Sequence, residues 1–136
     1  MSESLGTSIE LHDSVIGSIA LAEGAAYVAF RPAYIHRSAG EPGVDAGSGF
    51  IQELMLEFPS ARIDGDIGDL PAAIFSGEFH VESRMFPNTI SLPCKIEGAV
   101  SLVLFLSPDN RKIAISGCGV KARVDGEAVY IDEFLP

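Results

Sequence analysis

A histidine and an aspartate stand side by side near the start of the chain, within the stretch ELHDSVIGSIAL from Glu10 to Leu21. An imidazole beside a carboxylate can bind a metal ion or transfer a proton. Adjacent residues of a β-strand point to opposite faces, so such a pair cannot easily hold one ion. Because Val15 to Leu21 alternates like a strand, we interpret Asp13 and Ser14 as an Asx-type turn before it, with His12 at the sheet edge.

The chain has three histidines, and together they could bind zinc or iron on a β scaffold. If His12 takes part in function, it needs a partner from far along the chain, either His36 or His80. The strongest local cluster is EFHVE, in which alternate residues share one strand face. Cupins hold their metal inside a small β-barrel with an H-x-H pair, which is absent here. The metal hypothesis therefore has four ligands, namely Glu78, His80, Glu82 and His36, while the same strand face needs no metal if it only meets solvent.

The two cysteines, Cys94 and Cys118, do not form a C-x-x-C pair. The strand register described below separates them beyond disulfide reach, which predicts two free thiols. Cys118 shares the parity of the apolar residues Val120 and Ala122, and this pattern predicts a buried core thiol. The sequence has no G-x-S-x-G elbow, no P-loop and no dinucleotide-binding glycine motif. Nucleophilic catalysis therefore has little support.

Alternation of apolar and polar residues dominates the chain, and helical periodicity is almost absent. Strand patterns occupy residues 14–32 (a hairpin ended by Pro32), 50–59, 77–86, 89–92, 98–124 and 127–136. We therefore expect an all-β fold, a single antiparallel β-sandwich or flattened barrel of about eight or nine strands. At most one short helical turn is expected, near 69–75. Residues 1–5 are expected to be a flexible tail before a single domain, 6–136.

The clearest element is a hairpin around the turn Ser107–Asn110, whose proline and polar residues favour a type I turn. This turn places Leu104 opposite Ile113 and fixes the pairing along both strands. The segment Val100–Leu106 is apolar at almost every position, which predicts a central strand covered on both sides. The apolar face changes at Gly117–Gly119, which predicts a β-bulge.

One long segment, His36 to Ser48, has no strand pattern and is rich in glycine. Functional residues are often carried by such loops, so we expect this segment to be a loop that takes part in binding. Its candidate binding residues are His36, Arg37 and Asp45.

The charge is strongly acidic, with 9 Lys and Arg against 19 Asp and Glu and a net charge of −10. A field of this sign repels nucleic acid and anionic lipid. The start of the chain lacks the pattern of a signal peptide, and no apolar run is long enough to span a membrane. These features predict a cytoplasmic protein without nucleic-acid or membrane partners.

Our leading hypothesis is a non-catalytic binding protein that covers a basic surface on a protein partner. In size and charge the chain is similar to the bacterial immunity proteins that neutralise nuclease toxins, although no motif carries this likeness. The alternative is a metal-dependent or small-ligand-binding β-barrel of cupin-like architecture, with zinc or iron. A homodimer through the edge strands TSIEL (7–11) or YIDEF (130–134) is a third expectation.

Overall fold

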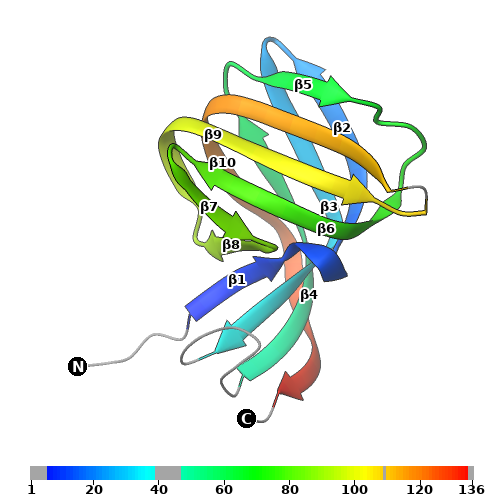
Figure 1. The fold of residues 1–136 in the computed structure, drawn as a ribbon. Coiled ribbons are helices and arrows are strands. Elements are labelled where there is room, and N and C mark those ends of the chain that lie inside the picture. The colour runs from blue at the N-terminus through cyan, green and yellow to red at the C-terminus, as the bar shows by residue number, and fades with distance from the viewer. Residues whose placement is uncertain (1–5, 39–46, 109, 135–136) are drawn as a thin grey trace.

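The computed structural model describes residues 6–38, 47–108 and 110–134 (Figure 1). These residues are nearly all β, which confirms the predicted all-β class, and they contain no α-helix. The ten strands are β1 (Gly6–Glu10), β2 (Val15–Ala22), β3 (Ala25–Ser38), β4 (Gly47–Phe58), β5 (Arg62–Gly65), β6 (Ala72–Val81), β7 (Arg84–Pro87), β8 (Thr89–Leu92), β9 (Lys95–Leu106) and β10 (Arg111–Phe134). One turn of 3₁₀ helix, η1 (Leu11–Asp13), joins β1 to β2.

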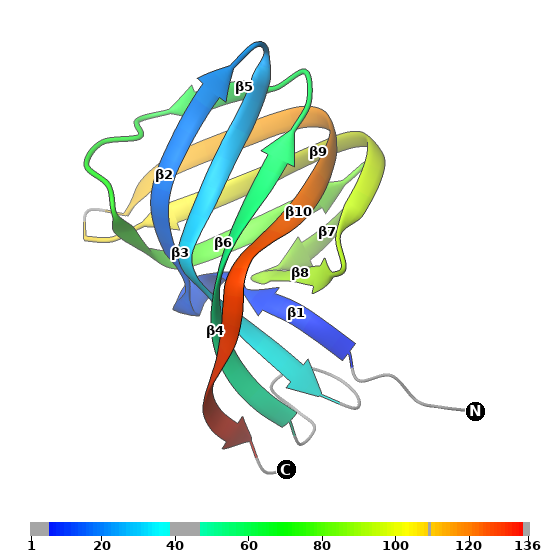
Figure 2. The same cartoon turned by 180° about the vertical axis from the view of Figure 1, so that it is seen from behind.

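Six strands close into a barrel in the order β2, β6, β9, β10, β4 and β3, and β3 pairs with β2 again. Seen from behind, β2, β3 and β4 cross in front of β6 and β9 (Figure 2). Four strands are added to this barrel: β1 and β8 beyond β3, β5 beside β10, and β7 beside β6. β10 is a single strand of 24 residues, where the sequence predicted a break before residue 127.

Side-chain alternation on β9 shows how the barrel fills its interior. Val100, Leu102, Leu104 and Leu106 are buried, whereas the residues between them are half-buried on the outer face. The expectation of a strand covered on both sides is therefore wrong, because the outward residues of β9 are only partly covered by the described residues. The interior is completed by large apolar side chains from the facing strands, including Phe30, Leu54, Leu56, Phe58, Ile113 and Ile115.

The predicted hairpin register between β9 and β10 is confirmed. Leu104 lies opposite Ile113, and the register shifts between Gly117 and Gly119 as the glycines indicated. Both cysteines are free thiols, also as predicted. The expectation of a buried Cys118 is wrong: this residue lies within the bulge, where alternation breaks down, and is exposed. Cys94 is the buried thiol.

Three boundary predictions are wrong. The segment 69–75 forms no helical turn, because β6 already begins at Ala72. Pro32 does not end the second strand, since β3 continues to Ser38 across a register shift between Phe30 and Ala33. His36 and Arg37 therefore lie on a strand and not in a loop. The ends of the predicted loop, Ser38 and 47–48, also lie on strands β3 and β4. Its middle, 39–46 with Asp45, and the predicted tail, 1–5, lie outside the described residues.

The predicted edge strand TSIEL is also not an edge. β1 pairs with β3 on one side and with β8 on the other, so the edge of the sheet there is β8. The segment YIDEF belongs to the far end of β10, where it pairs with β4. Within the described ranges, no helix has the length and apolar character needed to cross a membrane.

Candidate functional site

The connection from β1 to β2 is a tight turn held by Ser14. Its hydroxyl donates a hydrogen bond to the carbonyl of Glu10 (2.7 Å) and accepts one from the backbone N–H of Tyr34 (2.9 Å). The sequence predicted an Asx-type turn of Asp13 and Ser14 here, and the side-chain hydrogen bonds come from Ser14. Ser14 makes them because a buried serine can donate and accept at once, and it is almost fully buried.

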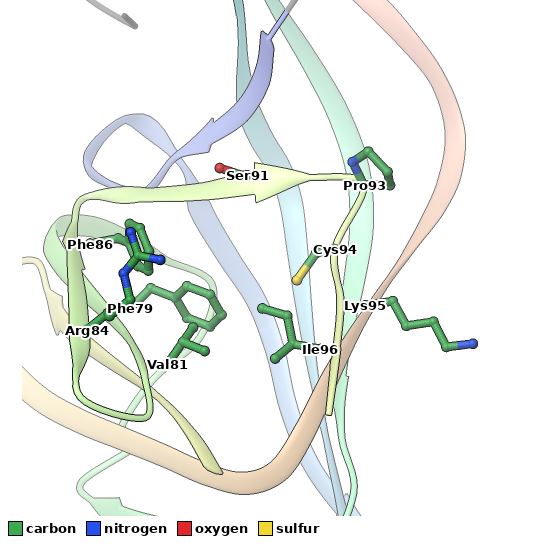
Figure 3. Close-up of a pocket in the computed structure, with 9 residues that line it drawn as sticks. All are labelled: Phe79, Val81, Arg84, Phe86, Ser91, Pro93, Cys94, Lys95 and Ile96. Atoms are coloured by element: carbon green, nitrogen blue, oxygen red, sulfur yellow. The ribbon is translucent and has the colours of Figure 1, made fainter. Parts of the chain in front are cut away.

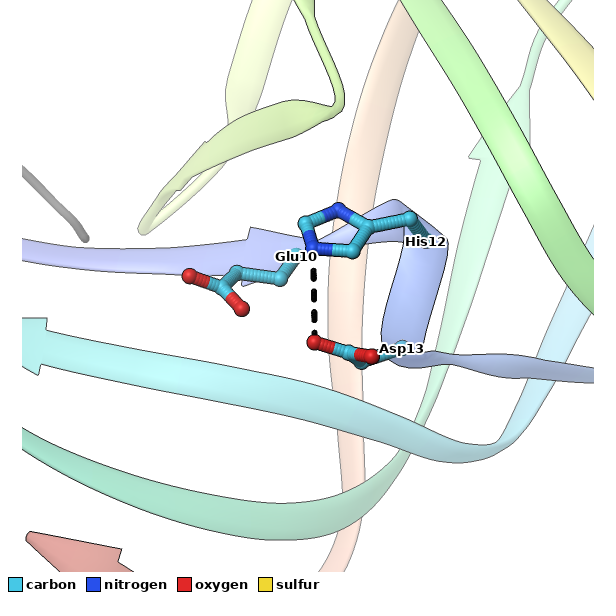
Figure 4. Close-up of side chains that lie close together, drawn as sticks. All are labelled: Glu10, His12 and Asp13. Carbon is cyan, nitrogen blue, oxygen red and sulfur yellow. Dashed lines mark ion pairs between the residues drawn. The ribbon is translucent and has the colours of Figure 1, made fainter.

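The turn brings His12 and Asp13 together. They belong to η1 and not to a strand, so the expectation that they point to opposite faces is wrong. Nε2 of His12 lies 3.4 Å from Oδ2 of Asp13, and both side chains are about half exposed (Figure 4). One ligand atom from each of Glu10, His12 and Asp13 lies within 4.8 Å of the other two. We call these three residues the turn cluster, and it is the only such group among the described residues.

A buried histidine stands behind the turn cluster. In the pairing of β1 with β3, Ser8 lies opposite His36 and Glu10 opposite Tyr34, so Glu10 and His36 are diagonal neighbours on one face. Nδ1 of His36 lies 2.9 Å from Oε1 of Glu10. A carboxylate only accepts hydrogen bonds, which assigns the proton to Nδ1. His36 therefore pairs with Glu10, one member of the turn cluster.

Of the four predicted metal ligands, the structure brings two into contact. Nε2 of His80 lies 3.1 Å from Oε1 of Glu78, with both side chains partly exposed. Glu82 lies in the β6–β7 turn with φ of 55°, beyond the end of the alternating strand. His80 and Glu82 line one shallow pocket of about 280 Å³. His36 bonds Glu10 instead. The other predicted binding residue described here, Arg37, has its guanidinium 5.0 Å from the ring centre of Phe50.

Sequence reasoning missed an apolar pocket of about 220 Å³ beside the barrel (Figure 3). It lies between the β6–β7 hairpin and the connection from β8 to β9. Its lining comprises Phe79, Val81, Arg84, Phe86, Ser91, Pro93, Cys94, Lys95 and Ile96. These residues are spread over four strands, so no local pattern marks the pocket. The closest signal in the sequence is a cysteine directly after the proline that ends TISL.

The reactivity of the buried thiol of Cys94, which lines this pocket, can be measured by alkylation. Burial disfavours the thiolate and raises the pKa of Cys94 above the ordinary value of a cysteine. In a Cys118→Ser variant we therefore expect alkylation of Cys94 by iodoacetamide to be slow at pH 8 and to accelerate as the pH rises toward the raised pKa. In a Cys94→Ser variant the exposed Cys118 should react faster at pH 8. Equal rates for the two thiols would contradict this expectation.

Comparison with known proteins matches this chain to no family model, no curated protein and no solved structure. The fold and the sites define only a class of protein. It is a closed six-stranded β-barrel with four added strands, a histidine–carboxylate cluster on a turn and an apolar pocket at its side.

Proposed function

We propose that this protein binds a divalent transition-metal ion, zinc or iron(II), at the turn cluster. The observation that carries the proposal is the convergence of three donor atoms within 4.8 Å, from Glu10, His12 and Asp13. Two carboxylates and an imidazole are donors that both ions accept. The proposal takes up the alternative hypothesis from the sequence, a metal-binding β-barrel, and moves its ligands from Glu78, His80, Glu82 and His36 to the turn cluster.

The spacing of the donors supports a metal of this size. Two donors bound tetrahedrally at 2.0–2.1 Å from zinc are about 3.4 Å apart. The separation of His12 Nε2 from Asp13 Oδ2 is 3.4 Å, which matches this distance between two donors. Glu10 has two carboxylate oxygens, and it can keep Oε1 on His36 while the other turns to the ion. Three protein ligands leave a coordination position for water or a further ligand.

The buried partner of Glu10 supports the same proposal. Metal ligands are usually oriented by hydrogen bonds from residues behind them, and loss of such a bond typically weakens metal binding by 10-fold to 100-fold. His36 does this for Glu10, because the imidazole is buried and the carboxylate side chain is only 13% exposed. The corresponding pair of His80 and Glu78 has no buried support, since both of its members are partly exposed.

The test compares two histidines that each pair with a carboxylate. In isothermal titration with Zn²⁺, and in the visible absorption of Co²⁺ as a spectroscopic substitute, we expect His12→Ala to weaken binding at least tenfold. We expect His80→Ala to leave the affinity unchanged. Both side chains are partly exposed, so neither change should disturb folding, and circular dichroism checks this.

Each contrary outcome has a clear meaning. Loss of Zn²⁺ binding in His80→Ala, with normal binding in His12→Ala, would return the site to Glu78 and His80. Binding that survives both substitutions would contradict the turn cluster as the site. Absence of Zn²⁺ and Co²⁺ binding by the unaltered protein would overturn the proposal altogether.

The acidic surface supports a second proposal, recognition of a basic protein partner without catalysis. Its basis is the net charge of −10. Complementary charge would steer such a complex, so its affinity should fall as salt is added. A partner recovered from host lysate whose affinity does not change with salt would contradict this second proposal. We also propose a cytoplasmic location, which is supported by the two free thiols because disulfides are rare in reducing compartments.

A further inference from the structure

The pocket beside the barrel has apolar walls. Phe79 and Cys94 are buried at its base, and Val81, Phe86 and Ile96 are partly buried around it. Figure 3 shows the sulfur of Cys94 and the side chain of Ile96 directed into the pocket from one side, opposite Val81 and Phe79. Such walls accept a hydrocarbon chain or ring and offer little to a strongly polar one.

The cationic side chain of Arg84 lies at the edge of this pocket. The guanidinium carbon of Arg84 lies 5.3 Å from the ring centre of Phe86. Stacking on an aromatic face leaves the N–H groups at the edge of the guanidinium plane open to an acceptor. Among the described residues no carboxylate forms an ion pair with Arg84. Lys95 also borders the pocket, but its side chain points away from it (Figure 3).

The size of the pocket limits its occupant. A cavity of about 150 Å³ holds benzene, which has six carbon atoms. By the same ratio, the volume of about 220 Å³ accepts roughly nine non-hydrogen atoms. A ligand of this size is a short hydrocarbon chain or a single ring with a small substituent, and not a full-length lipid.

We propose that this pocket binds a small amphipathic monocarboxylate, with its apolar tail against Phe79 and Ile96 and its carboxylate on the guanidinium of Arg84. Apolar walls select the tail, and the planar fork of arginine matches a carboxylate in two parallel hydrogen bonds. The local charge of Arg84, which has no carboxylate partner among the described residues, favours an anionic ligand over a neutral or cationic one, even though the net charge of −10 opposes anions at long range. The inference is independent of the turn cluster and of any metal bound there.

The probe is octanoate, with octanol and octylammonium as analogues of the same chain length and different head-group charge. In the Cys118→Ser variant, Cys94 is the only thiol, and iodoacetamide labelling followed by intact mass reports on the pocket. We expect saturating octanoate to slow the labelling of Cys94 at least fivefold, octanol to slow it less, and octylammonium to leave it unchanged. Cys118, measured in a Cys94→Ser variant, should label at the same rate with and without octanoate.

Two arginine variants test the head group. Arg84→Gln should raise the Kd for octanoate about tenfold in isothermal titration, as expected for loss of a charge-assisted hydrogen bond. Arg62→Gln removes the same charge from β5, where the side chain is exposed and pairs with Asp64 instead, and it should leave the Kd unchanged. Both arginines are exposed, so both variants should fold.

Three results would overturn the proposal. The first is that octanoate neither slows the labelling of Cys94 by iodoacetamide nor gives a heat of binding in isothermal titration. The second is octylammonium that binds as tightly as octanoate, which would exclude selection for an anion. The third is an equal Kd in Arg84→Gln and Arg62→Gln, which would remove Arg84 from the site. Zn²⁺ affinity, measured on the same samples, should not change with Arg84→Gln.

Discussion

Replacement of His36 by alanine is expected to lower the free energy of unfolding by about 3 kcal/mol. The imidazole is buried, so its removal leaves a cavity, and it also takes the hydrogen-bond partner at 2.9 Å from a carboxylate that is largely shielded from water. The cavity and the lost hydrogen bond both lower the free energy of unfolding. Urea unfolding followed by circular dichroism measures the change, with the slope m unaltered if the folded structure is retained.

The matched control is His80→Ala. It removes the same side chain from a similar pair, His80 with Glu78 at 3.1 Å, but both members remain in contact with water. Exposed pairs contribute between zero and about 1 kcal/mol, so we expect a loss below about 1 kcal/mol here. A variant with Glu10→Gln keeps an acceptor for Nδ1 and should retain most of the stability. Equal losses for His36→Ala and His80→Ala would show that burial of the pair has no energetic role.

Leu104→Ala is expected to have a similar or larger effect, a loss of about 3–4 kcal/mol. Leu104 is fully buried on β9, opposite Ile113 of β10 and Gly77 of β6, so its side chain fills the space over the glycine. The barrel is closed, and its strands cannot easily move inward to fill the cavity. The midpoint of thermal unfolding should fall by about 10 °C.

The neighbouring Val103 serves as the control, since it lies on the same strand and points outward. Val103 is half-buried, so Val103→Ala should cost about 1 kcal/mol or less. A loss for Val103→Ala as large as that for Leu104→Ala would mean that the outer face of β9 is covered by something, for example a second copy of the chain. Light scattering would then measure the oligomeric state directly.

Much of the fold could be predicted because the signals are local. A proline and polar residues in SPDN specify a turn, and a turn fixes the pairing of the strands on both sides of it. The register of β9 with β10 and the bulge between Gly117 and Gly119 both follow from this segment. The strand predicted over 50–59 lies within β4 (Gly47–Phe58), and its alternate residues Leu54, Leu56 and Phe58 are buried on one face.

Closure of the barrel could not be predicted, because it depends on pairings between distant segments. Nothing near Val15 indicates that this residue pairs with Ala73. The same limit explains the error at β1, which has strand patterning of its own but takes both neighbours from far along the chain. The alternation of residues predicts a buried Cys118, but this alternation is interrupted at the β-bulge in which Cys118 lies.

The turn cluster was missed for a different reason. Strand geometry does not hold for His12 and Asp13, because the 3₁₀ turn η1 lies between the two strands and turns both side chains to one side. The serine that holds this turn, Ser14, is next to them in sequence. The sequence alone marks His36 as a candidate, but its contact with Glu10 depends on the long-range pairing of β1 with β3.

The barrel is closed on one side by a short pairing between β2 and β6, which we call the β2–β6 joint. β2 and β6 are paired through only two residue pairs, Val15 with Ala73 and Ile16 with Ala72, next to a hydrogen bond from the N–H of Ile74 to the carbonyl of Ser14. Local opening of the barrel should begin at the β2–β6 joint. The backbone amides of this joint should therefore exchange with solvent faster than those of β4 and β10. The turn that carries His12 and Asp13 leads directly into the joint. An ion that binds at the turn and orders it would therefore also stabilise the closed barrel. Its binding would slow amide exchange in β2 and β6, in residues that do not contact the ion.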